Sequence, residues 1–127
     1  MSDISCGFVG LGAMGRPLAL NRHRAGCLSA VFNRSPEKAA TLAEETGVAA
    51  VVELGDLAKR VNAVVLCVPA DDDVLAAVET LAASLAPGSF VLDCSTVAAA
   101  TAEAAAARLA SEDIGFLDCP VSGGTEG

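Results

Sequence analysis

The chain has 127 residues, which suits one domain with its own hydrophobic core and is too short for two domains of ordinary size. Apolar residues make up 53% of it and aromatic residues only 3%, so the core must consist of aliphatic side chains, as in a parallel sheet covered by helices. The formal net charge of −8 argues against a nucleic acid partner, because phosphate backbones require basic patches.

The acidic charge is concentrated in the second half of the chain. Residues 1–60 contain seven Lys or Arg against six Asp or Glu, whereas residues 61–127 contain one against ten. A less acidic first half favours an anionic ligand there, although ordinary variation between helix surfaces explains the imbalance equally well.

The cysteines, the single histidine and the N-terminus give little sign of metal, disulfides or membrane. There is no C-x-x-C pair and no cluster of histidines, and an odd number of cysteines does not make a complete disulfide framework. No stretch approaches the roughly 18 apolar residues of a spanning helix, and Met1-Ser2-Asp3 does not begin a signal peptide. We therefore expect a cytoplasmic protein without a metal or membrane partner, in which five thiols serve as small core residues: Cys6, Cys27, Cys67, Cys94 and Cys119.

The first predicted elements are a strand, a glycine-rich turn and a helix in immediate succession. The apolar run of residues 4–9 predicts a buried strand, and Gly10, Gly12 and Gly15 follow it with the spacing G-x-G-x-x-G. In a dinucleotide-binding fold the first glycine permits a sharp turn, the second lets phosphates approach the backbone, and the third lets the helix pack closely on the strand. The helix N-terminus also offers unpaired N–H groups to an anion. We therefore expect a cofactor pyrophosphate to bind the turn formed by Gly10, Leu11, Gly12, Ala13, Met14 and Gly15.

The helix after this turn is predicted over about residues 13–25, with Gly26 at its end. Helical spacing places His23, the only histidine, on the solvent side, which argues against a catalytic role for it. The packed face is expected to consist of Met14, Leu18, Asn21 and Ala25.

Residues 28–32 form the second predicted strand, and polar residues follow its carboxyl end. In a dinucleotide fold, an Asp or Glu about 20 positions beyond the glycines binds the ribose hydroxyls of NAD, but no carboxylate is present here. Arg34 instead offers a forked cation to a 2′-phosphate, and Asn33 and Ser35 offer neutral hydrogen bonds. This pattern favours NADP over NAD as the cofactor. The alternative is that Ser35 only caps the next helix, a role we also expect of it, so Arg34 is the residue that separates the two interpretations.

The middle of the chain continues the alternation of helices and strands. Helices are predicted over residues 36–46 and 54–61, and strands over residues 48–51 and 63–68, the last ended by Pro69. A further helix begins near residue 70 with three consecutive aspartates, Asp71, Asp72 and Asp73. Consecutive positions diverge around a helix axis, so a favourable interaction with the helix dipole explains these aspartates better than a metal site.

The last predicted elements complete an α/β fold. Strands are expected over residues 89–93 and 114–119, separated by an alanine-rich helix over residues 97–111. Strands that alternate with helices predict a doubly wound parallel sheet of the Rossmann type, with about six strands in the order 3-2-1-4-5-6 and helices on both faces.

Polar or glycine-rich segments follow three strands at the edge where such sheets bind ligands. They are the glycine turn, Ser95-Thr96, and Ser122-Gly123-Gly124. Serine hydroxyls and glycine N–H groups converging on one cleft hold a small carboxylate without a countercharge.

These motifs together resemble the β-hydroxyacid dehydrogenase family, over essentially the whole chain. The glycine turn with Asn33-Arg34-Ser35 is similar to the family's cofactor signature, Asp93-Cys94-Ser95-Thr96 to its D-x-S-T segment, and residues 118–124 to its D-x-P-V-S-G-G segment. The resemblance implies reversible hydride transfer between NADP(H) and a small 3-hydroxy acid or its semialdehyde. It further implies roles for six residues: Ser122, Gly123 and Gly124 would bind the substrate carboxylate, Thr96 would lie near the nicotinamide, and Val68 and Pro69 would line the cofactor cleft.

The chain departs from the family pattern in two places. Ala99 stands where members usually have a proline, which affects only the stiffness of that loop. The family's catalytic lysine lies on a helix after the dinucleotide domain, so it is expected beyond Gly127, the last residue. The two lysines that are present, Lys38 and Lys59, are predicted on helices far from the cleft. We therefore interpret residues 1–127 as a dinucleotide-binding domain without the helical substrate and dimerisation domain of a homo-oligomeric enzyme. We expect it to bind cofactor and to turn over little or no substrate.

Two further interpretations remain open at this point. One is a non-catalytic NADP-binding module. The other is an imine-reductase-like domain, since those enzymes resemble the same family and often lack its lysine. The loop of Ser122, Gly123 and Gly124 disfavours the imine interpretation, because an imine substrate does not need a carboxylate site.

Overall fold

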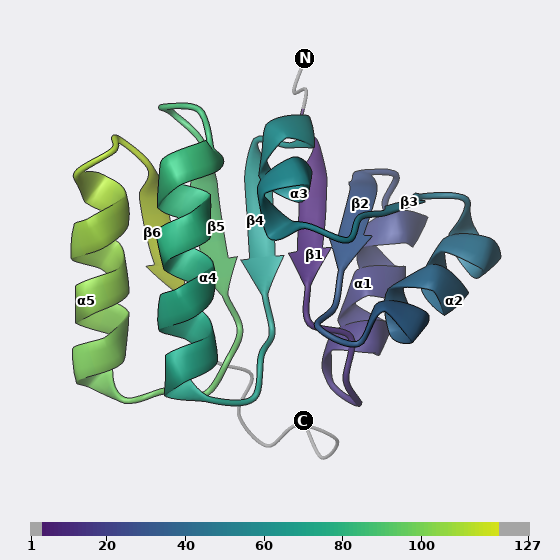
Figure 1. Ribbon diagram of the computed structural model, residues 1–127, viewed down its shortest axis with the longest axis horizontal. Coiled ribbons are helices and arrows are strands. Elements are labelled where there is room, and N and C mark those ends of the chain that lie inside the picture. Colours follow the sequence, from purple (N-terminus) through teal and green to yellow (C-terminus); the bar gives the residue numbers. More distant parts are fainter. Residues whose placement is uncertain (1–3, 120–127) are drawn as a thin grey trace.

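The computed structural model describes residues 4–119, which form strands and helices in strict alternation (Figure 1). The strands are β1 (Cys6–Val9), β2 (Leu28–Phe32), β3 (Ala49–Ala50), β4 (Ala63–Leu66), β5 (Phe90–Asp93) and β6 (Gly115–Asp118). The helices are α1 (Gly15–Arg24), α2 (Pro36–Thr46), α3 (Leu54–Arg60), α4 (Asp71–Ser84) and α5 (Ala99–Ala110).

All strands of this sheet run parallel in the order β3-β2-β1-β4-β5-β6, which confirms the predicted topology. The chain proceeds outward from β1 to β3, then returns to place β4 beside β1 and proceeds outward on the other side. The last residues of β1, β4 and β5 are in register, since Val9 pairs with Leu66 and Leu66 with Asp93. The loops that follow these strands therefore leave one edge of the sheet side by side, next to the point where the strand order reverses.

The helices cover the sheet on two faces, each with its own aliphatic core. On one face α3, α4 and α5 enclose buried residues that include Leu57, Val78 and Leu109. On the other, α1 and α2 contribute Ala19 and Leu42 to a second buried cluster. Figure 1 shows α3, α4 and α5 in front of the sheet and α1 behind it. Over residues 4–119, no helix has the length and apolar character needed to cross a bilayer.

The packed face of α1 differs from the prediction. Gly15 and Ala19 are its buried residues, whereas Asn21 is exposed and accepts a hydrogen bond from Arg24 at 2.9 Å, and His23 is half-buried rather than on the solvent side. The reason is that α1 approaches the sheet through Gly15, which has no side chain. Leu18, which belongs to the predicted face, packs beside Ala19 against the core, so the helix meets the sheet through Gly15, Leu18 and Ala19 rather than through Asn21.

The cysteines also differ in burial from the expectation that all five are core residues. All five are free thiols, but only Cys6 is fully buried and Cys119 is exposed. Burial raises the pKa of the Cys6 thiol to about 12, and burial together with the neighbouring Cys67 and Cys119 raises the pKa of Cys94 to about 11. These two thiols are therefore protonated near neutral pH and are poor nucleophiles.

Candidate functional site

The glycine turn after β1 has the backbone geometry that its sequence predicts. Gly10 has φ +101°, a conformation that favours glycine, and a Cβ atom there would collide with the carbonyl of Cys67. A Cβ atom on Gly15 would collide with the carbonyl of Gly10, so α1 approaches β1 more closely than any larger residue allows. Gly12 is different, because a Cβ atom there would meet no protein atom within 4 Å. Its neighbourhood is open space next to the N-terminus of α1.

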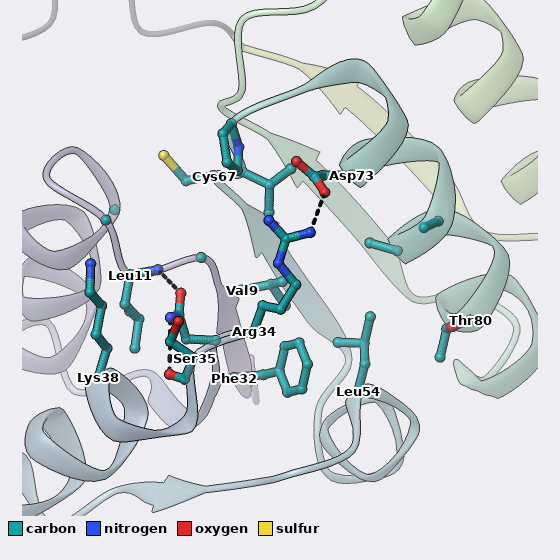
Figure 2. A pocket seen from close by; sticks show the side chains of 18 of the residues that line it. Val9, Leu11, Phe32, Arg34, Ser35, Lys38, Leu54, Cys67, Asp73 and Thr80 are labelled. Carbon is teal, nitrogen blue, oxygen red and sulfur yellow. Dashed lines mark hydrogen bonds and ion pairs between the residues drawn. The ribbon is translucent and has the colours of Figure 1, made fainter.

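The side chain of Asn33 fixes this turn from the neighbouring strand. Its Oδ1 accepts a hydrogen bond of 2.7 Å from the N–H of Leu11, and its Nδ2 donates to the carbonyl of Ser35 at 3.1 Å. Both bonds are drawn in Figure 2. Asn33 therefore ties the β1 turn to the β2 turn, and its acceptor is used within the protein rather than left for a ligand.

A cavity of about 650 Å³ opens beside the glycine turn at the carboxyl edge of the sheet. Its size lies within the range of roughly 300–1,000 Å³ that is typical of cofactor sites. Val9, Phe32 and Leu54 give it an apolar wall (Figure 2). The cofactor residues expected from the sequence all line it except Thr96: Gly10, Leu11, Gly12, Ala13, Met14, Gly15, Asn33, Arg34, Ser35, Val68 and Pro69.

Arg34 does not stand alone in the cavity, because a carboxylate from α4 faces it. Its Nη1 lies 3.0 Å from Oδ1 of Asp73, and both side chains line the cavity (Figure 2). The sequence shows no acidic residue directly after β2, but the fold brings this one from the other half of the sheet. The available signal was the position of Asp73 in the first turn of α4, directly after the strand that pairs with β1.

The three aspartates of α4 have separate surroundings. Asp71 accepts hydrogen bonds from the hydroxyl of Thr101 at 2.7 Å and the N–H of Ala98 at 3.0 Å, which hold its pKa below the ordinary value. Asp72 is exposed, and Asp73 pairs with Arg34. Within residues 4–119, no group of three or more His, Cys, Asp or Glu side chains is arranged to hold a metal ion.

Lys38 is placed differently from the sequence-based expectation. It was expected far from the cleft, yet it lines the cavity near Ser35 and is exposed on the first turn of α2. The chain changes direction between residues 34 and 38, where α2 begins at Ser35-Pro36. The sequence alone therefore did not show that both side chains line the same cavity. The cavity thus has two cations at its β2 end, Arg34 and Lys38.

The D-x-S-T segment supports the opposite wall of the cavity. The hydroxyl of Ser95 accepts a hydrogen bond of 2.9 Å from the N–H of Val68, and Asp93 accepts one of 2.9 Å from the N–H of Ser95. Asp93 is fully buried, and its Oδ2 has no hydrogen-bond partner among the described residues. Burial raises the pKa of Asp93, the bonds from Ser95 oppose this effect, and the charge of Asp118 adds to it. Ser95, expected to face the cleft, is buried and positions Val68 instead.

One expected contact lies outside the cavity, and others fall on residues that the structure does not describe. Thr96 is exposed just after β5, outside the residues that line the cavity. The substrate residues Ser122, Gly123 and Gly124 lie outside the described residues. Gly127, beyond which the catalytic lysine is expected, lies outside them too, so that expectation stays a prediction.

A parallel sheet in this order, with a glycine turn and a cavity at the switch point, defines a nucleotide-binding domain of the Rossmann type. The chain belongs to the family of the NAD-binding domain of 6-phosphogluconate dehydrogenase, whose sequence model matches residues 5–127. This result confirms the resemblance noted from the sequence motifs.

Similar proteins include dehydrogenases that act on small hydroxy acids. The NAD-dependent L-serine dehydrogenase of Pseudomonas aeruginosa is 36% identical over 123 residues, which are 94% of this chain and 41% of that protein. A structure of the Mycobacterium tuberculosis 3-hydroxyisobutyrate dehydrogenase with L-serine superposes with a TM-score of 0.89 at 28% identity, covering 97% of this chain and 42% of that one. Psf3 in complex with NADP+ and 2-OPP gives a TM-score of 0.84 at 32% identity, with 96% and 43% coverage. The chain thus spans about two fifths of the length of these relatives.

Proposed function

We propose that the cavity binds NADP(H) with the pyrophosphate against the glycine turn. The observation that carries this proposal is the open space at Gly12 beside the N-terminus of α1, bounded by two glycines that admit no side chain. Phosphates approach such a turn closely and accept hydrogen bonds from its N–H groups. The apolar wall of Phe32 and Leu54 suits the adenine ring, which is flat and largely apolar on its faces.

The preference for NADP over NAD rests on the β2 end of the cavity. Arg34, Ser35 and Lys38 line the cavity after β2, and we propose that their two cations and one hydroxyl bind the 2′-phosphate. The relatives support either cofactor, because the L-serine dehydrogenase is named as NAD-dependent while Psf3 was solved with NADP+. The choice is therefore assigned from the residues of this chain rather than from the family.

The reaction proposed for the whole protein is hydride transfer between NADP(H) and a small 3-hydroxy acid or its semialdehyde. The bound nicotinamide supplies or accepts the hydride. The described residues orient the cofactor: Asn33 holds the glycine turn, while Asp93 and Ser95 hold Val68 at the opposite wall. The names of the relatives, which include L-serine and 3-hydroxyisobutyrate dehydrogenases, support the substrate class.

Substrate binding and proton transfer are proposed for other parts of the protein. Ser122, Gly123 and Gly124 are proposed to bind the substrate carboxylate through a hydroxyl and backbone N–H groups. Lys38 lies at the β2 end of the cavity and Lys59 is exposed on α3, so neither suits proton transfer at the substrate. We propose that this step uses a lysine beyond Gly127, and that the 127-residue chain binds cofactor without turnover.

Titration calorimetry of the 127-residue chain with NADPH and with NADH tests the proposal. We expect NADPH to bind more tightly, and Arg34→Ala to weaken NADPH binding roughly tenfold, the equivalent of one charge-assisted hydrogen bond. The same variant is expected to change NADH binding less than about twofold. Arg60→Ala is the matched control, because it removes an exposed arginine at the far end of α3. Equal affinities for the two cofactors would remove the NADP assignment, and no binding of either would remove the dinucleotide site.

A further inference from the structure

We propose that Asp73 is a specificity-determining residue of the cofactor site, because its carboxylate competes with the 2′-phosphate of NADP for the guanidinium of Arg34. This inference rests on the proposed function. It assigns to α4 a part in cofactor choice, which in this fold is otherwise read from the residues that follow β2. If Asp73 acts in this way, the ratio of NADP affinity to NAD affinity is smaller than Arg34 and Lys38 alone would give.

The two side chains come from different elements that line the cavity. Arg34 follows β2, Asp73 belongs to the first turn of α4, and 39 positions separate them in sequence. The contact is a single charge-assisted bond of 3.0 Å between Nη1 and Oδ1 (Figure 2). Both residues line the cavity, so a 2′-phosphate that binds Arg34 there meets a guanidinium that is already paired with Asp73.

The two partners of this ion pair differ in how far their side chains are exposed to solvent. The Arg34 side chain is 82% exposed, whereas that of Asp73 is 23% exposed. An ion pair with so exposed a guanidinium is screened by solvent and contributes little to stability. The pair is therefore weak as a structural connection, and its carboxylate belongs to the first turn of α4, which lines the cavity.

A 2′-phosphate arriving at Arg34 meets Asp73 in either of two ways. It displaces the carboxylate, which costs the existing bond, or it shares the guanidinium, which brings two anions close together. NAD has a hydroxyl at that position, and a hydroxyl donates a hydrogen bond to a carboxylate rather than being repelled by it. Asp73 therefore weakens NADP binding and leaves NAD binding unaffected or slightly favoured.

The other acidic residues near the start of α4 provide a matched control. Asp72 is the adjacent residue in the same helical turn and is exposed, but it does not line the cavity. Asp72→Asn and Asp73→Asn thus remove the same charge at the same end of the same helix. Only the second removes a carboxylate that faces Arg34.

The experiment is a titration of the 127-residue chain and its variants with NADP+ and with NAD+, at low ionic strength and again at high salt. We expect Asp73→Asn to bind NADP+ roughly five- to tenfold more tightly than the wild type at low salt, with NAD+ changed by less than about twofold. The gain should shrink at high salt, because screening weakens charge interactions between exposed groups. Asp72→Asn should match the wild type, and Asp73→Glu should retain most of the wild-type preference.

The outcomes separate this inference from the function on which it rests. If dinucleotides bind but Asp73→Asn leaves the ratio of NADP+ to NAD+ affinity within about twofold of wild type, the inference is overturned and the dinucleotide site stands. An equal gain in Asp72→Asn also overturns it, because the effect would then be one of net charge. If neither dinucleotide binds to the wild type or to any variant, the proposed function fails and the inference with it. Thermal unfolding of each variant checks that the fold is intact.

Discussion

Replacing Gly12 with alanine separates a glycine needed by a ligand from a glycine needed by the fold. Gly12 lines the cavity, its φ lies outside the left-handed region, and an added Cβ atom would contact no protein atom within 4 Å. Alanine at such a position restricts the unfolded chain and stabilises a protein by about 0.4–1 kcal/mol. The free energy of unfolding of Gly12→Ala is therefore expected to equal or slightly exceed that of the wild type.

The same methyl group is expected to impair cofactor binding. If the pyrophosphate lies against the turn, a Cβ atom at Gly12 pushes it away from the backbone N–H groups that would donate hydrogen bonds to it. Loss of one such charge-assisted bond costs about 1.5–3 kcal/mol, which is roughly a 10- to 150-fold loss of affinity. Calorimetric titration with NADPH measures the affinity, and urea denaturation of the same samples measures the stability.

Gly10→Ala is the contrasting variant. Its Cβ atom would meet the carbonyl of Cys67, and φ +101° is strained for alanine, so a loss of about 2–5 kcal/mol in unfolding free energy is expected. The proposed position of the pyrophosphate is wrong if Gly12→Ala binds NADPH as tightly as the wild type. The distinction between the two glycines is wrong if Gly12→Ala is destabilised as much as Gly10→Ala.

Three further predictions concern the cavity and the core. Lys38→Ala is expected to weaken NADPH binding about tenfold in calorimetry and to leave NADH binding unchanged. Lys59→Ala, at an exposed position of α3, is the control, and an equal loss of NADPH affinity in both variants would contradict the placement of Lys38 in the site. Burial raises the pKa of Asp93 in the folded protein above its ordinary 3.8. The contribution of this group to the free energy of unfolding is therefore fully present below about pH 4 and is lost as the pH rises through the folded-state pKa. Urea denaturation from about pH 4.5 to 7.5 should show the unfolding free energy of Asp93→Asn rising relative to that of the wild type, and parallel pH curves for the two proteins would count against this. Leu57→Ala, at a fully buried position of α3, is expected to lower the free energy of unfolding by about 2–5 kcal/mol in the same assay. Leu75→Ala, at an exposed position of α4, should lower it much less, and similar losses in the two variants would contradict the assigned core.

The sheet and its order were predictable because they depend on local patterns and on chain connectivity. Short aliphatic runs bounded by glycine or proline give the strands, and helices between them require right-handed crossovers to parallel neighbours. The glycine turn was predictable for the same reason, since Gly10 and Gly15 occupy positions where backbone geometry excludes side chains. These features were therefore visible as patterns within short stretches of the sequence.

The features that the sequence did not reveal depend on contacts between distant segments. Asp73 reaches Arg34 only because the strand order reverses between β1 and β4, and that contact spans 39 positions. Ser95 looked like a ligand contact after β5, but its hydroxyl is used to hold the N–H of Val68. A residue type at a strand end therefore indicated where the site lies, but not which side chains remain free to bind.

Whether a dinucleotide binds against the glycine turn can be read directly from the amide chemical shifts of the isotope-labelled 127-residue chain during titration with NADP+. We predict saturable shifts at the amides of Gly10, Gly12 and Gly15 and at Arg34 and Lys38, with the amides around Ala105 in α5 unchanged. Saturable shifts centred on α5 with the glycine turn unchanged, or no saturable shifts at all, would contradict the proposed site.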